Sequence, residues 1–232
     1  MIGRTALIDI AAVTRRDGLA AGLTAAFDPR DPVPCSPAGR TLVPARLRPA
    51  VRSWAVAGVQ VPTAVCRVEI ERHDLARSER VELVRVTRMT PWQHAARTVT
   101  GPALPAPDPV NGSGWPAGLL AVRAGLSRRL LGRALDQLAG RTSDGAPLTE
   151  RQLVRAEIAE VAIVLETVEA VLAVPPRGSD TDFWHAEIDR ADLILARLFG
   201  AAGYLDDHPA RALRLVGLLR DVFAPVGFRA VS

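Results

Sequence analysis

Apolar side chains recur at alternating steps of four and three residues through the second half of the chain. The clearest run contains Val154, Ile158, Val161, Leu165, Val168 and Leu172. A second run repeats the spacing with Trp184, Ile188, Ala191, Leu195 and Leu198. Such spacing places every member of a run on one helix face, and that face must pack against partner helices. The sequence therefore predicts a helical bundle here.

Turn signals divide this half into four helices. Trp115-Pro116 opens the first, because proline suits the first helical turn, and Gly140 ends it. Thr149-Glu150-Arg151-Gln152 has the form of a capping box for the second. The expected helices cover 115–139, Thr149 to the prolines at 175 and 176, 181–199 and 207–223. Short connections between them predict an antiparallel four-helix bundle over residues 111–232.

The first half, residues 1 to about 110, carries prolines and β-branched residues. A helix is expected over 13–27, whereas the proline-rich stretch 28–34 fits neither a helix nor a central strand. Strand-like runs follow, and residues 73–78 could link two of them as a hairpin. These runs cover 53–61, 63–70 and 79–88. We expect a short N-terminal segment and a small antiparallel β domain over 1–110, with a linker at 101–109, and an α+β, mostly α, fold overall.

Charge and composition exclude several functions. The 29 basic residues are all arginine, the net charge is +4 and the pI is about 10.2. Without lysine the chain cannot form a Schiff base or a P-loop, and its arginine use is typical of a GC-rich bacterial genome. Arginines alternate with acidic residues, so mixed-charge solvated faces are expected rather than a nucleic-acid surface.

The sequence also argues against metal, membrane and secretion. Two cysteines, Cys35 and Cys66, make neither a disulfide framework nor a zinc site. Glutamates interrupt the longest apolar stretch, residues 158–174, so it is not a membrane span. The first residues lack a signal-peptide pattern. We expect a soluble cytoplasmic protein.

The ordered motifs of the second half resemble the C-terminal helical domain of acyl-CoA dehydrogenases. The turn Arg141-Thr-Ser-Asp-Gly145-Ala-Pro-Leu148 is similar to the family's turn after the first bundle helix. Gln152-Leu-Val154 and Ile158-Ala-Glu-Val161 follow in the family's order. The glycine turn Gly200-Ala-Ala-Gly203-Tyr204 and then Pro209-Ala-Arg211 complete a match of about 110 residues.

The resemblance implies a flavoprotein that binds FAD and acts on an acyl thioester. By this resemblance, the residues expected to contact the cofactor are Arg141, Ser143, Arg197, Gly200 and Gly203. Arginine can hold a phosphate through two parallel hydrogen bonds. Alternatively, Arg141 could cap the first helix's carbonyls, the glycines could merely turn the chain, and no cofactor would then be bound.

The chain departs from the family where catalysis is concerned. The family's usual catalytic glutamate falls on Ala224, and the alternative position falls near Trp115; neither side chain is a base. An aromatic residue of the first turn is replaced by Asp144, and a glutamine before the glycine turn by Arg197. The length leaves no room for the family's N-terminal helical domain of more than a hundred residues.

Other constellations carry less chemistry. Asp182-x-x-His185 and Glu157-x-x-Glu160 imitate part of a dimetal carboxylate site, but His185 is expected at the rim of the apolar face, and no metal site is predicted. No Gly-x-Ser-x-Gly elbow occurs.

Three functions remain open. The first is an acyl-CoA dehydrogenase-like flavoprotein subunit, incomplete alone and completed by a full-length partner in a homo- or hetero-oligomer. The second is a catalytically silent scaffold. The third is a re-purposed flavin-independent enzyme of secondary metabolism, for cyclisation or dehydration, with acid–base groups among His73, Asp74, His94 and Asp144.

Overall fold

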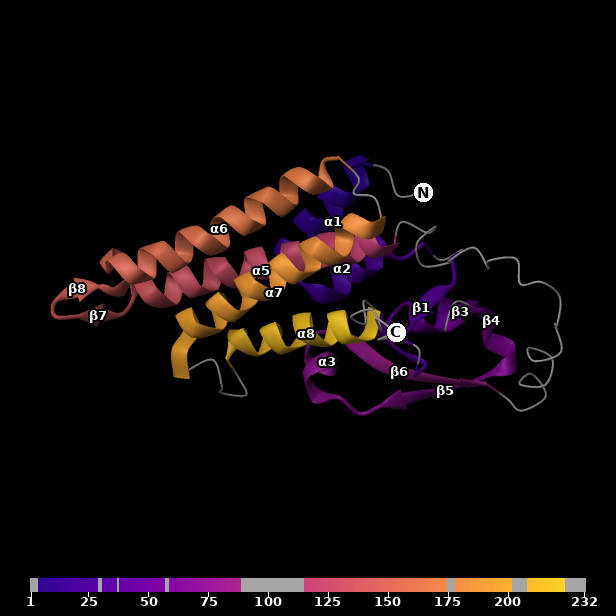
Figure 1. Ribbon diagram of the computed structural model, residues 1–232. Helices are drawn as coiled ribbons and strands as arrows, with labels where there is room; N and C mark the ends of the chain where they lie inside the picture. The colour runs from indigo at the N-terminus through magenta and orange to yellow at the C-terminus, as the bar shows by residue number, and fades with distance from the viewer. Residues whose placement is uncertain are drawn as a thin grey trace, which may run out of the picture.

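The structure is a computed structural model of the 232-residue chain. It describes residues 4–28, 31–36, 38–56, 59–88, 115–174, 178–201 and 208–223. A long helical bundle occupies one side of the molecule, and two small sheets occupy the other (Figure 1). The predicted linker at 101–109 and His94 lie outside the described residues.

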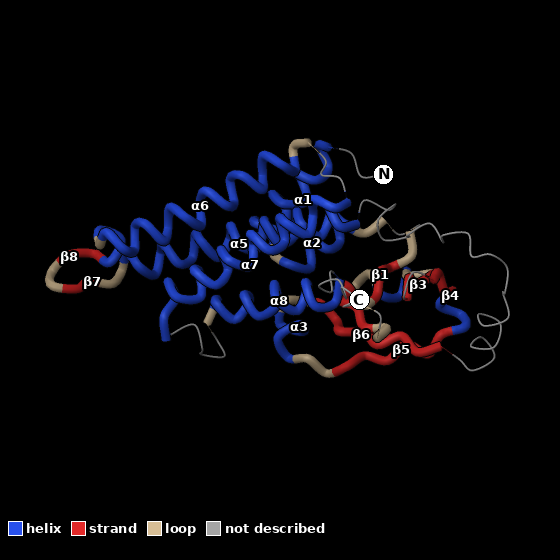
Figure 2. The backbone as a smooth tube through the Cα atoms, viewed as in Figure 1, coloured by secondary structure: helices blue, strands red, loops and turns tan. Residues whose placement is uncertain are grey.

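The helices of the second half confirm the periodicity of the sequence, and two further helices come before the sheets. They are α1 (Arg4–Asp17), α2 (Leu19–Ala26), α5 (Trp115–Ala139), α6 (Gln152–Leu172), α7 (Gly178–Phe199) and α8 (Ala212–Phe223). Helix α5 lies at the centre and contacts α1, α2, α6, α7 and α8 (Figure 2). Most of its residues are buried. The described helices include none that is long and apolar enough to cross a membrane.

The beginning of α6 corrects one prediction. Residues Leu148–Glu150 form a short 3₁₀ helix, and Arg151 rather than Thr149 precedes the first residue of α6. No side chain caps this end. The predicted capping box is therefore wrong, because Thr149 itself lies in the 3₁₀ helix and the extended residue Arg151 takes the N-cap position of α6.

The N-terminal helices also differ from the single helix expected over 13–27. Gly18 has φ 91°, a conformation that side chains rarely adopt, and it separates α1 from α2. Both helices pack on α5 and share its hydrophobic core. The helical core thus contains elements from both sides of the expected boundary at residue 110, and that boundary lies outside the described residues.

The strands form two three-stranded sheets rather than one. Their bounds are β1 (Val33–Cys35), β2 (Arg40–Pro44), β3 (Ser53–Val56), β4 (Val59–Pro62), β5 (Cys66–Glu71) and β6 (Val81–Arg88). The orders are β1-β3-β4 and β2-β6-β5. All pairs are antiparallel except β1 with β3. Proline-containing β1 is an edge strand, the position in a sheet that tolerates proline.

The predicted hairpin is confirmed. Strands β5 and β6 pair antiparallel and are joined through the short helix α3 (Asp74–Ser78). Successive side chains of β2 and β6 point to opposite faces of their sheet, so this sheet lies between two hydrophobic cores. Leu42 and Leu83 join the helical core, whereas Val43 and Val84 pack with Val33, Trp54 and Val56 of the other sheet.

Helices α1, α2 and α5 approach closely because glycines lie between them. A methyl group on Gly125 would lie 2.3 Å from the carbonyl oxygen of Ala11, and one on Gly22 would lie 1.9 Å from the Thr14 hydroxyl oxygen. Thr14 is itself buried, and its hydroxyl donates to the carbonyl of Ile10 at 2.7 Å. Small residues here are required by the helix spacing.

We predict opposite effects for two glycine-to-alanine changes on α5. Gly125→Ala should lower the free energy of unfolding by about 1–3 kcal/mol, because backbone must move to admit the methyl group. Gly132→Ala, where nothing lies within 4 Å, should raise it by about 0.5–1 kcal/mol through helix propensity. Denaturant unfolding measures both, and equal effects would contradict this packing.

Candidate functional site

The turn that carries Arg141 is a tight hairpin at the far end of the bundle (Figure 1). Strands β7 (Thr142–Ser143) and β8 (Ala146–Pro147) pair antiparallel between α5 and α6. Asp144 and Gly145 have φ of 50° and 80°. Positive φ at both central residues is the signature of a type I′ turn, for which Asp-Gly is a favoured sequence.

Arg141 is exposed and its side chain is free to meet a ligand. Its backbone amide donates to the carbonyl of Leu138 at 3.2 Å. Its guanidinium has no hydrogen bond or ion pair among the described residues, so it does not cap the carbonyls of α5. The structure therefore leaves the phosphate-binding interpretation of Arg141 in place and does not support the capping alternative.

The residues around Arg141 are already paired with one another. Ser143 donates its hydroxyl to Asp144 at 3.3 Å, and Arg151 holds the Asp144 carboxylate at 2.8 Å. Arg151 also donates to the backbone carbonyl of Ser143. Because Arg151 neutralises Asp144, the carboxylate next to Arg141 opposes an incoming anion less strongly.

Of the other expected cofactor contacts, Arg197 lies in the last turn of α7 (Gly178–Phe199) and Gly200 directly follows that helix. Arg197 forms an ion pair with Glu157 of α6 at 3.0 Å. Gly200 follows α7 with φ 60°, and Gly203 lies outside the described residues. Arg197 and Gly200 line an open hollow with Ala210 and Arg214. No hydrogen bond or ion pair within the described parts joins Arg141 to this hollow.

The position of the alternative catalytic base is filled by an aromatic cluster. The ring of Trp115 stacks on Phe27 at 4.7 Å and meets the edge of Phe223 at 5.0 Å. Trp115 is only 4% exposed. Ala224, at the usual base position, follows Phe223 and lies outside the described residues. The cluster joins the start of α5, the end of α8 and the segment after α2 around rings without a basic group.

The remaining candidate acid–base residues are not brought together. Nδ1 of His73 accepts a hydrogen bond from the backbone amide of Ala76 at the start of α3. Asp144 lies in the hairpin at the opposite end of the bundle (Figure 1). Within the described ranges no three His, Cys, Asp or Glu side chains gather as metal ligands.

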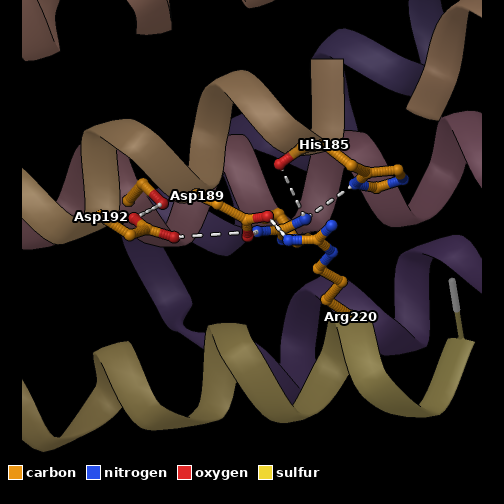
Figure 3. Close-up of polar contacts among 6 residues, drawn as sticks. His185, Asp189, Asp192 and Arg220 are labelled. Carbon is orange, nitrogen blue, oxygen red and sulfur yellow. Dashed lines mark hydrogen bonds and ion pairs between the residues drawn. The ribbon is translucent and has the colours of Figure 1, made fainter. Parts of the chain in front are cut away.

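Sequence reasoning missed a buried polar cluster in the middle of the bundle (Figure 3). Its members are Arg123 and Ser127 on α5, His185, Asp189 and Asp192 on α7, and Arg220 on α8. The side chain of Arg123 is fully buried. His185, expected at the rim of an apolar face, is only 3% exposed, so that prediction was wrong.

Arg123 is the partner of most polar side chains in the cluster. Its guanidinium lies 3.0 Å from Nδ1 of His185, donates to the carbonyl of His185 at 3.3 Å and pairs with Asp189. Since Arg123 can only donate, Nδ1 accepts and the proton of neutral His185 lies on Nε2. Asp189 pairs also with Arg220. Ser127 donates to Asp192 at 2.6 Å.

Burial shifts two ionisation equilibria in this cluster. Desolvation, assisted by the charges of Arg123 and Arg220, lowers the pKa of His185 to about 3. Desolvation raises the pKa of Asp192 to about 6, although Arg123 and Ser127 act against this shift. Since Arg123 is fully buried, we assign the cluster to helix positioning. Its sequence signal was the spacing 185, 189 and 192, which places three polar side chains on one face of α7.

We predict that Asp192→Asn steepens the acid sensitivity of the fold. In the native state Asp192 takes up a proton as pH falls through about 6, and this stabilises the folded wild type. His185 takes up a proton below pH 6.5 in the unfolded state, and this destabilises the folded wild type. The variant keeps only the second effect. From pH 7 to 5 its free energy of unfolding should therefore fall by about 1 kcal/mol more than that of the wild type. His185→Gln should shift the profile in the opposite sense, and parallel profiles for all three proteins would contradict the assignment.

Comparison with solved structures identifies the fold. A glutaryl-CoA dehydrogenase from Mycobacterium smegmatis in complex with FADH2 matches with a TM-score of 0.52 and 13% identity, over 83% of this chain and 57% of that chain. A second structure of that enzyme has a TM-score of 0.51 and 13% identity, over 90% and 59%. FkbI, for biosynthesis of the methoxymalonyl extender unit of Fk520, has a TM-score of 0.51 and 16% identity, over 82% and 61%.

Sequence comparison adds no relative. No protein-family model and no curated protein matches the chain. The chain spans about three-fifths of the length of the solved structures it matches, 57% to 61%. The resemblance predicted from the motifs is thus confirmed at the level of architecture: the chain has the α+β fold of the acyl-CoA dehydrogenases.

Proposed function

We propose that the chain is an acyl-CoA dehydrogenase-like flavoprotein subunit that acts on an acyl thioester with a full-length partner subunit. Arg141 is the observation that carries the proposal. It is exposed, it is unpaired within the described residues, and a type I′ hairpin holds it at the end of α5. A guanidinium so placed suits the pyrophosphate of FAD, the kind of cofactor present in the FADH2 complex with the same fold.

The residues present fit a contribution to a shared cofactor site. FAD, when bound, would supply the acceptor for hydride removed from the acyl thioester. This chain would hold the pyrophosphate through Arg141, with Ser143 in the same hairpin. The resemblance also assigns cofactor contacts to the backbone at Gly200 and Gly203. The partner would supply the base, because Trp115 and Ala224 have no group that accepts a proton.

A second candidate is favoured by the aromatic cluster. With Trp115 enclosed by Phe27 and Phe223, the start of α5 is packed as a core. A chain of this kind could act as a catalytically silent assembly subunit without flavin. Flavin binding separates the two functions, since the silent subunit needs no free Arg141.

We predict that Arg141→Ala weakens flavin binding by the complex of this chain and its partner. Losing a charge-assisted, two-point phosphate contact of about 1.5–3 kcal/mol should lower FAD affinity roughly 10- to 100-fold. Arg155→Ala, which removes another exposed arginine from α6, is the matched control and should leave affinity unchanged. Quenching of FAD fluorescence on titration measures both.

Two results would reject the flavin proposal. One is equal affinity for Arg141→Ala and the wild type. The other is absence of FAD binding by the wild-type complex, which would favour the silent subunit.

A further inference from the structure

The two cysteines lie on different sheets but border the same hydrophobic core. Cys35 is the last residue of β1, and Cys66 is the first residue of β5. Both are free thiols that are partly exposed to solvent. Both also pack against the inter-sheet core, the cluster of buried side chains to which Val33 on β1 and Val86 on β6 belong.

Strand alternation directs both side chains toward the inter-sheet core. Side chains two residues apart in a strand lie on the same face of the sheet. Cys35 therefore shares its face of β1 with Val33, which is 5% exposed, and Cys66 shares its face of β5 with Val68. Val33 belongs to the inter-sheet core and Val68 packs against it. Each thiol thus projects toward the sheet that carries the other thiol.

The turn after Cys35 brings the end of β1 close to β6. The amide of Val86 donates to the carbonyl of Gly39 at 2.8 Å. A methyl group on Gly39, which has φ 76°, would lie 2.4 Å from the carbonyl oxygen of Val86, so only glycine permits this approach. Val86 is paired with Val68, two residues from Cys66. The segment that follows Cys35 therefore contacts the part of the second sheet that is next to Cys66.

The two thiols also influence each other electrostatically. Burial, with a smaller contribution from the charge of Cys66, raises the pKa of the Cys35 thiol to about 12. Ionisable groups affect one another in this way only when they are close together. At neutral pH Cys35 is therefore a protonated thiol. Because the thiolate is the reactive form of cysteine, Cys35 by itself should react slowly with an oxidant.

We propose that Cys35 and Cys66 form a modification site, at which a hydroperoxide oxidises the pair to one intramolecular disulfide between the two sheets. Both residues end edge strands of their sheets. There the backbone can adjust to the Cα separation of about 4.4–6.8 Å that a disulfide requires. In proteins of reducing compartments such disulfides are usually transient and redox-sensing. The inference is independent of flavin binding.

The oxidation has two balanced steps. The sulfur of Cys66 attacks a peroxide oxygen, the O–O bond breaks, and an alcohol or water leaves with the proton of the thiol, so that Cys66 becomes a sulfenic acid. The sulfur of Cys35 then attacks the sulfenic sulfur. The S–O bond breaks, the S–S bond forms, and the proton of Cys35 leaves in a water molecule. The two thiols lose two electrons, which the peroxide accepts, and proximity offsets the low thiolate content of Cys35 in the second step.

The disulfide should stabilise the β region. It closes the loop 35–66, which contains β2, β3 and β4. Closing such a loop restricts the unfolded chain more than the folded one. The midpoint of thermal unfolding should therefore rise by about 5–10 °C on oxidation, and dithiothreitol should reverse the rise.

Treatment of the full chain with stoichiometric hydrogen peroxide tests the site. The wild type should lose both free thiols together, lose the mass of two hydrogen atoms and remain a single chain on a non-reducing gel. Peptide mapping without reductant should give one linked pair, which contains Cys35 and Cys66. Persistence of both thiols, oxygen adducts on the cysteines in place of the link, or disulfide-linked dimers would overturn the proposal.

Single-cysteine variants test the order of the two steps. In Cys35→Ser the sulfenic acid of Cys66 has no thiol beside it, so dimedone should trap it about tenfold more than in the wild type. Cys66→Ser is the matched control and should react with peroxide much more slowly, because its remaining thiol is Cys35. Neither variant should gain thermal stability on oxidation. Equal trapping in Cys35→Ser and the wild type, equal peroxide reactivity of the two variants, or a gain in stability by either would contradict the pairing.

Discussion

A single arginine charge in the helical core sets the arrangement of the bundle. Arg123 is fully buried on α5, and α7 supplies Asp189, Asp192 and His185 as its partners. Arg220 then brings α8 to the same carboxylate of Asp189. Removing one member of such a buried pair costs about 3–5 kcal/mol, because the remaining charge stays desolvated. The polar cluster thus fixes which faces of α7 and α8 meet α5.

Helix α5 connects this cluster to the two ends of the molecule that matter for function. At its start, Trp115 packs with Phe27 and Phe223 where the sheets meet the bundle. At its end, the hairpin exposes Arg141 to solvent. One end is therefore packed as a core and the other is open to a ligand, which fits a subunit that contributes a cofactor contact without a catalytic base.

The sequence predicted what apolar spacing alone decides. The regular runs on α6 and α7, and the proline and glycine at the ends of α5, were enough to place these helices. It could not predict β1 and β2, because Val33-Pro34-Cys35 and residues 40–44 are strands only through their long-range partners. Likewise, nothing local distinguishes Arg123 from a solvated arginine. Its burial follows from three helices that meet far apart in the sequence, which is also why His185 was misplaced.

The candidate site also combines features that local sequence predicts with features that depend on long-range contacts. A turn beginning at Arg141 was predicted between two helices, and the structure shows that it is a hairpin. The positive φ values of Asp144 and Gly145 explain the hairpin by local turn chemistry.

The visible absorption spectrum of the chain after gel filtration, alone and co-expressed with a full-length acyl-CoA dehydrogenase-like partner, tests the central claim most directly. The account predicts flavin absorbance that co-elutes with both chains and exceeds the flavin content of the partner purified by itself. Flavin content that is the same with and without this chain, or a colourless complex, would contradict it.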